Sequence, residues 1–174
     1  DNSTGKIFTF TSTSSGSSTS TVIHTGNGLG TLNLGDASAY TGNLQSGWGS
    51  SSDGNITFTA LSDAVGAGNL RAGGGTGGRR AKFTLTGDAG PLTFNNRKVE
   101  FLNSAVTGTL TLVNANTNAA NSWVINTNLV TGSATQTRTL EFDGVNTGAN
   151  AFAGLIANTT GGGVVSVAKA GAGT

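Results

Sequence analysis

Hydrophobic and polar residues alternate along the chain in short runs, which is the pattern of half-buried β-strands. Large apolar residues recur at every second position, and Thr, Ser and Asn occupy most positions between them. About eleven such runs predict strands around Ile7/Phe8/Phe10, Val22/Ile23, Leu32/Leu34, Ile56/Phe58, Phe83/Leu85, Leu92/Phe94, Val99/Phe101, Leu110/Leu112, Val124 or Trp123/Ile125, Leu140/Phe142 and Val165/Val167.

Because side chains alternate between the two faces of a strand, one face of each run is expected to form the core. The Thr and Ser neighbours of the core residues are expected to point outward. The residues predicted to point inward are Phe8, Phe10, Ile56, Phe58, Phe83, Leu85, Phe94, Phe101, Leu110, Leu112, Leu140 and Phe142.

Clusters of Gly, Asn, Asp and Ser separate the runs and predict turns, since these residues tolerate turn conformations. The segment Gly73 to Gly78 is the longest of them and is expected to be a loop. Residues 62–72 could hold a brief helical turn that Ser62 and Asp63 would cap. No interdomain linker is evident, so residues 1–174 are interpreted as one module, part of a longer chain or of a repeating fibre.

Composition narrows the fold class to all-β. Gly (29), Thr (28), Asn (18) and Ser (17) make up about half of the chain, so strong helix formers are too few for a helical bundle. Lys and Arg number 9 and Asp and Glu 8, and this near-neutral balance argues against nucleic acid as a partner. No apolar run is long enough for a membrane-spanning helix. Cys and Met are absent, which fits a secreted, oxidation-resistant protein.

A β-sandwich, a closed barrel and a β-solenoid all accommodate many short strands. The many Asn, Thr and Gly residues around irregular apolar pairs favour the solenoid, in which small polar residues fill tight corners between stacked coils. Coils of roughly 20–25 residues are expected. The fold prediction is therefore a parallel β-solenoid, with a β-sandwich as the alternative.

The titratable residues do not form a recognisable catalytic, cofactor or metal site. His24 is the only histidine and is interpreted as structural. Glu100 and Glu141 lie within predicted strands and are expected to face outward near Lys98 or Arg138. Arg79 and Arg80 are expected at an exposed loop tip. Turn positions are predicted for Asp36, Asp53, Asp63, Asp88 and Asp143. We therefore expect a protein that is not an enzyme and has no cofactor.

Two features keep a binding function open. Repeated Thr-x-Thr steps are typical of outward strand positions, and on a flat solenoid face they could also order water as an ice-binding surface. Trp48, Tyr40 and Trp123 could stack on sugars, or they could be core plugs or subunit contacts. The Thr steps are Thr9/Thr11, Thr57/Thr59, Thr84/Thr86, Thr109/Thr111 and Thr137/Thr139.

Residues 138–174 resemble the autotransporter-associated β-strand repeat, also called the passenger-associated repeat. Residues 22–42 resemble the following piece of the same motif and end in Ala39-Tyr40-Thr41-Gly42, although His24 stands where Lys is usual and the aromatic before Leu32 is missing. The matching residues in the first stretch are Phe152, Gly154, Ile156, Val165, Val167, Lys169, Gly171, Gly173 and Thr174.

This resemblance implies a right-handed β-helix in an exported bacterial passenger or adhesin without enzymatic activity. The expected function is a structural or adhesive module of an extracellular fibre or cell-surface protein. Its expected partners are further copies or neighbouring repeats of the same chain, joined by β-stacking. The alternative is a carbohydrate-binding or ice-binding solenoid with glycans as partners.

Overall fold

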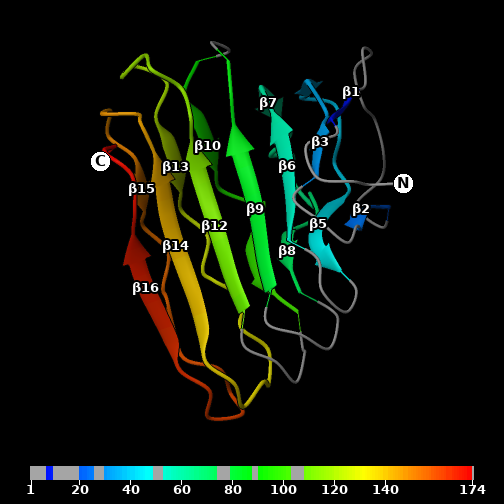
Figure 1. Ribbon diagram of the computed structural model, residues 1–174, viewed down its shortest axis with the longest axis vertical. Coiled ribbons are helices and arrows are strands. Elements are labelled where there is room, and N and C mark those ends of the chain that lie inside the picture. Colours follow the sequence, from blue (N-terminus) through cyan, green and yellow to red (C-terminus); the bar gives the residue numbers. More distant parts are fainter. Residues whose placement is uncertain are drawn as a thin grey trace.

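The chain is wound into a β-solenoid of parallel strands, and its described part contains no helix (Figure 1). The computed structural model describes residues 7–9, 20–25, 30–48, 53–73, 79–87, 90–102 and 108–173. Every strand pair is parallel, and the paired strands lie one coil apart in the sequence. The solenoid prediction is therefore confirmed. A β-sandwich would have required antiparallel hairpins instead.

A seven-stranded parallel sheet forms one side of the solenoid. Its strands lie in chain order along the solenoid axis, so β1 and β16 are its two outer strands. In order they are β1 (Ile7–Thr9), β3 (Thr31–Asn33), β6 (Gly54–Phe58), β9 (Arg79–Leu85), β12 (Gly108–Asn114), β14 (Arg138–Gly144) and β16 (Val165–Lys169).

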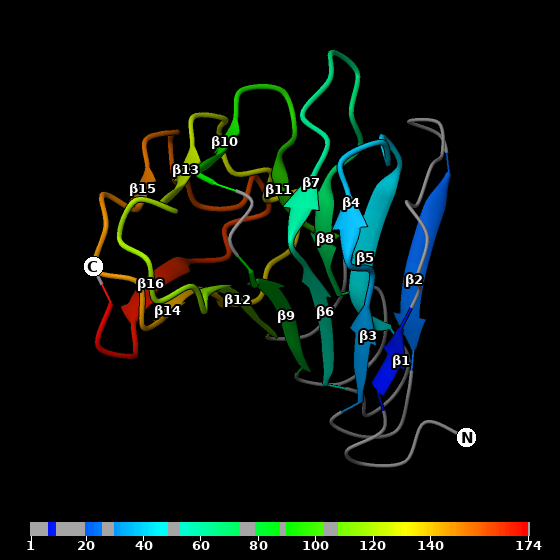
Figure 2. The ribbon, with the colours of Figure 1, turned by 90° about the horizontal axis from the view of Figure 1, so that it is seen from above.

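Shorter sheets form the other sides. Seen from above, β15, β13 and β10 lie across the interior from β16, β14 and β12 (Figure 2). The four-stranded sheet contains β2 (Thr21–Thr25), β5 (Asn43–Trp48), β8 (Leu70–Ala72) and β11 (Val99–Phe101). The three-stranded sheet contains β10 (Leu92–Phe94), β13 (Trp123–Ile125) and β15 (Ala151–Phe152), and β4 (Asp36–Ala37) pairs with β7 (Ala60–Leu61).

The coils lengthen toward the C-terminus. A single ladder of register partners crosses the seven-stranded sheet, and the step from Thr31 to Asn55 is 24 residues. The following steps are 27 residues to Lys82, 29 to Thr111 and 30 to Glu141. The predicted coil length therefore fits the first step and is too short for the later ones.

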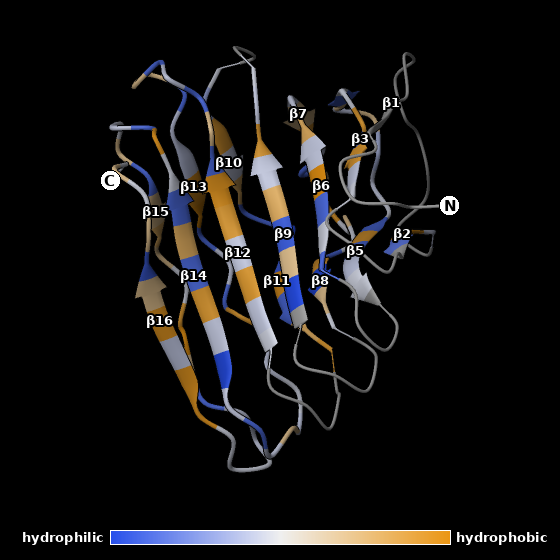
Figure 3. Cartoon of the chain, viewed as in Figure 1, coloured by the Kyte–Doolittle hydropathy of each residue, from blue (hydrophilic) through white to orange (hydrophobic). Residues whose placement is uncertain are grey.

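The core consists of the inward-facing residues of all these strands. Strands such as β12 and β14 show the alternation of apolar and polar residues directly (Figure 3). Phe142 is only half-buried, and the side chains of Phe8 and Phe10 lie outside the described residues. The other predicted core residues are confirmed as buried, namely Ile56, Phe58, Phe83, Leu85, Phe94, Phe101, Leu110, Leu112 and Leu140.

Two sequence-based expectations about local structure are wrong. Residues 62–72 contain no helical turn, and Leu70–Ala72 form strand β8 instead. The Asp63 carboxylate accepts hydrogen bonds from the backbone N–H groups of Asn95, Asn96 and Arg97 on the neighbouring coil, so it caps a loop and not a helix. Strand β5 also lies partly in a segment whose Gly and Ser content predicts a turn.

Candidate functional site

The C-terminal end of the solenoid leaves one strand edge unpaired in each of two sheets. Among the described residues, β16 pairs only with β14, and β15 pairs only with β13. We call the surface formed by residues 151–156 and 164–169, together with Phe142, the end face. Unpaired parallel edges are templates for the pairing of a further strand.

Apolar side chains that would be core residues in an inner coil are exposed at the end face. Val167 continues the inward-facing ladder of Leu110 and Leu140. Both leucines have an exposed fraction of 0%, whereas Val167 is 57% exposed. The end face is therefore an interrupted core layer.

Other apolar residues support the same description. Among the described residues, four of the six exposed large hydrophobic side chains follow Gly144 in the chain. Phe142 and Phe152 pack against each other at 6.0 Å between ring centroids and are only half-buried. The four exposed side chains are Val145, Leu155, Val164 and Val167.

A pocket of about 300 Å³ opens into the core beside the end face. The buried Trp123 forms part of its wall, packed edge-on against Phe58 and Phe94 with ring centroids 5.8 Å away in both cases. The indole N–H of Trp123 has no acceptor among the described residues. The other apolar walls come from Leu112, Ile125, Phe142, Phe152 and Ile156.

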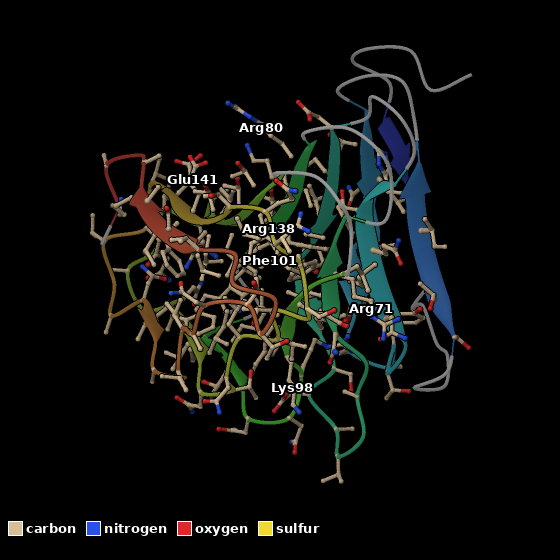
Figure 4. The ribbon with its side chains drawn as sticks, turned by 90° about the horizontal axis from the view of Figure 1, so that it is seen from below. Arg71, Arg80, Lys98, Phe101, Arg138 and Glu141 are labelled. Atoms are coloured by element: carbon tan, nitrogen blue, oxygen red, sulfur yellow. The ribbon has the colours of Figure 1, made fainter. Side chains whose placement is uncertain are left out.

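A second, polar depression lies on the outer face of the seven-stranded sheet. We call it the polar groove; its volume is about 360 Å³ and its lining is entirely of Gly, Thr, Asn and charged residues. Arg80 and Lys82 on β9 line it together with Glu141 and Asp143 on β14. Arg80 and Glu141 both extend outward from this sheet (Figure 4).

His24 is a buried structural residue, in agreement with its interpretation from the sequence. Its exposed fraction is 5%, and its register partner Ser46 is fully buried. Gly54 allows this packing, because a Cβ there would lie 2.5 Å from His24 Nδ1 and from Ser46 Oγ. Burial lowers the pKa of His24, so the imidazole is neutral in the folded protein at neutral pH.

The two glutamates lie on different sheets and do not form a carboxylate pair. Glu100 on β11 accepts hydrogen bonds from Arg71 Nε at 2.8 Å and from Asn69 Nδ2 at 2.7 Å. The expectation that Lys98 or Arg138 would be its neighbour is wrong. Glu141 on β14 accepts only a long hydrogen bond, 3.4 Å, from Thr111 Oγ1.

Arg138 belongs to the interior rather than to the outer surface. It is 2% exposed, and its guanidinium carbon lies 6.0 Å from the centroid of the Phe101 ring, a cation–π distance. The two side chains lie side by side between the sheets (Figure 4). Burial lowers the pKa of Arg138.

The aspartates organise turns and loops, as the sequence predicts. Asp36 accepts a hydrogen bond from the Ser38 N–H at 2.8 Å, and this bond lowers the pKa of its carboxyl group. Asp53 accepts one from the Arg80 N–H at 2.9 Å. Asp143 lies near the end of β14, and Asp88 lies outside the described residues. The described residues contain no cluster of acidic and histidine side chains that could hold a metal ion.

The candidate binding features are less regular than a ligand surface would require. Tyr40 and Trp123 are buried, so the interpretation as core plugs is the one confirmed for them. The Tyr40 hydroxyl donates to the Asn43 carbonyl at 2.9 Å, and burial raises its pKa. Thr57 pairs with Thr84 and Thr109 with Thr139, but Lys82 and Glu141 interrupt these rows. The side chains of Trp48 and Arg79 lie outside the described residues.

Arg97 is a structural centre that the sequence does not reveal. Its side chain is completely buried between coils. The guanidinium donates to four backbone carbonyls, which belong to Tyr40, Gly42, Ser62 and Gly68, at 2.7–2.9 Å. Burial lowers its pKa to about 10, so it remains charged at neutral pH.

Comparison with known proteins gives no relative for this arrangement. No protein family matches the chain. No curated protein and no solved structure matches it either. In the described part of the chain, no helix is long and apolar enough to cross a membrane.

Proposed function

We propose that this chain is a structural or adhesive module of an extracellular bacterial fibre or surface protein that is extended by β-stacking at its end face. The observation that carries the proposal is the exposure of Val167, which continues the buried ladder of Leu110 and Leu140. A further coil on β16 would bury this layer as each inner coil buries its neighbour. The sequence resemblance to autotransporter-associated repeats supports the location at a bacterial surface.

The backbone of β16 has donors available for such a coil. Arg138 N donates to the Val164 carbonyl, and Ala170 N donates to the Phe142 carbonyl. Because N–H direction alternates along a parallel strand, the N–H groups of Val165, Val167 and Lys169 point toward the unpaired edge. An added strand would therefore receive both main-chain hydrogen bonds and apolar contacts.

Copies of the chain have the geometry to supply that strand. The outer strands β1 and β16 belong to the same parallel sheet, at its two opposite ends. Placing β1 of one copy on β16 of the next continues the sheet in the same direction. Such a head-to-tail contact does not close on itself and produces a filament.

The alternative, a carbohydrate-binding or ice-binding solenoid, has less support. Sugar stacking requires exposed aromatic rings, and both Tyr40 and Trp123 are buried. Ice binding requires regular rows of Thr, and charged residues interrupt the rows on the seven-stranded sheet.

The test is a proline at Val167. Proline removes the N–H that points to the unpaired edge and is tolerated at the outside of a sheet. We expect Val167→Pro to keep the strand signal in far-UV circular dichroism and to lose filaments in electron microscopy. The matched control is Val167→Thr, which keeps the N–H and the β-branched shape and should still assemble.

Two results would contradict the proposal. One is a wild-type chain that stays monomeric at every concentration tested. The other is a Val167→Pro variant that assembles as readily as the wild type. Ser166→Pro removes a donor to β14 instead, and we expect it to disrupt β16 and lower the stability of the folded chain.

A further inference from the structure

We infer that the polar groove is a lateral docking surface for a second copy of this chain, in which Lys82 of each copy pairs with Glu141 of the other. This inference concerns the outer face of the seven-stranded sheet and does not depend on stacking at the end face. The two copies would be related by a two-fold axis that passes through Thr111 parallel to the strands.

Three residues in one ladder define the surface. Lys82 on β9 is the register partner of Thr111 on β12, and Thr111 is the partner of Glu141 on β14. Neighbouring strands are about 4.8 Å apart, so the backbone positions of Lys82 and Glu141 are separated by roughly 10 Å. The face therefore carries a positive column, a small hydroxyl column and a negative column, in that order.

The charges of these columns are not satisfied within the chain. Neither the Arg80 side chain nor the Lys82 side chain has a hydrogen-bond or ion-pair partner in the described part of the molecule. Glu141 has only the 3.4 Å hydrogen bond from Thr111. Arg80 is exposed, and Lys82 and Glu141 are partly exposed. The polar groove thus presents charges of both signs to a partner.

The order of the columns selects the partner and its orientation. A two-fold axis parallel to the strands reverses the column order, so that each Lys82 faces a Glu141 and Thr111 faces its own copy. An axis along the solenoid would place Lys82 opposite Lys82 and cause repulsion. The face is therefore self-complementary in one arrangement only, with the two solenoids antiparallel and an isologous contact between them.

The chemistry of the lining also favours a charged protein surface over an apolar ligand, because no apolar side chain lines the groove. Exposed ion pairs are individually weak, so the contact between two single copies is expected to be weak. In a stacked array the same contact repeats along the filament, and multivalency would strengthen it. Lateral pairing of filaments is the consequence.

The experiment is a charge exchange measured by sedimentation. We expect wild-type chains to dimerise at about 10 mM salt and to dissociate at about 1 M salt, where screening shortens from roughly 30 Å to 3 Å. Lys82→Glu and Glu141→Lys should each weaken homodimers at least about tenfold, since like charges then face each other. Mixing these two variants should restore pairing, because one is then acidic on both columns and the other basic. The double variant should also pair.

Lys98→Glu is the matched control, because Lys98 is exposed and extends from the opposite side of the solenoid (Figure 4). It should dimerise like the wild type. The inference is overturned if the wild type stays monomeric at low salt, or if neither the mixture nor the double variant restores pairing. Repeating the series with Val167→Pro separates this contact from end-to-end stacking, since each can then fail alone.

Discussion

The Nη1 atom of Arg97 donates a hydrogen bond of 2.8 Å to the carbonyl oxygen of Gly42, a residue 55 positions earlier in the chain. The same nitrogen donates to the Gly68 carbonyl at 2.7 Å. One side chain thereby connects corners of successive coils, where the backbone turns and its carbonyls have no strand partner. The guanidinium acts as an internal cross-link of the solenoid.

Removing this cross-link should destabilise the fold strongly. Arg97→Met leaves four buried carbonyls without donors, and we expect a loss of roughly 3–5 kcal/mol in the free energy of unfolding. Arg97→Lys should also destabilise, because an ammonium group cannot reproduce the planar arrangement of the guanidinium donors. Urea denaturation measures both. The control Arg71→Met breaks the partly exposed pair with Glu100 and should cost at most about 1 kcal/mol.

Acid should destabilise the protein through His24. Burial lowers its pKa in the folded state below the ordinary value of 6.5, so the unfolded chain binds a proton first as the pH falls. The free energy of unfolding should therefore decrease from about pH 7 to pH 5. His24→Gln removes the only histidine, and its stability should vary less over this window. Equal slopes in the two proteins would contradict the assignment.

Phe101 and Arg138 should be energetically coupled. Phe101→Ala removes a ring that is only 2% exposed, and we expect a loss of about 3–5 kcal/mol. A double-mutant cycle with Arg138→Met isolates the cation–π term, which should be about 0.5–2 kcal/mol. A coupling energy near zero would show that the guanidinium contributes no more than packing at this position.

The alternating pattern predicts the strands well because it records burial on one face. The eleven predicted runs coincide with strands, but β5 and β8 were missed because their Gly, Ser and Asn content is typical of turns. Arg97 could not be identified, since it follows Asn95 and Asn96 in a segment that reads as a polar loop. Its burial depends on carbonyls supplied by two earlier coils, which no local pattern encodes.

The end face shows the same limit. The sequence predicts that Val165 and Val167 form a strand, which is correct. It cannot show that Val167 lies at an outer strand while Leu140 lies inside, because both follow the same alternation. The polar groove depends likewise on the register that brings Lys82, Thr111 and Glu141 into one ladder, and coil lengths of 29 and 30 residues set that register.

Gly154 should be irreplaceable because two coils touch at this position. A Cβ there would collide with the carbonyl oxygen of Thr127 on the preceding coil. Gly154→Ala should therefore force the coils apart and cost about 1–3 kcal/mol or more, measured by urea denaturation. Gly162→Ala is the control, because the space around that residue is open and only its φ of +91° opposes a side chain. If Gly154→Ala were no more destabilising than this control, close contact between coils would not be what requires glycine at position 154.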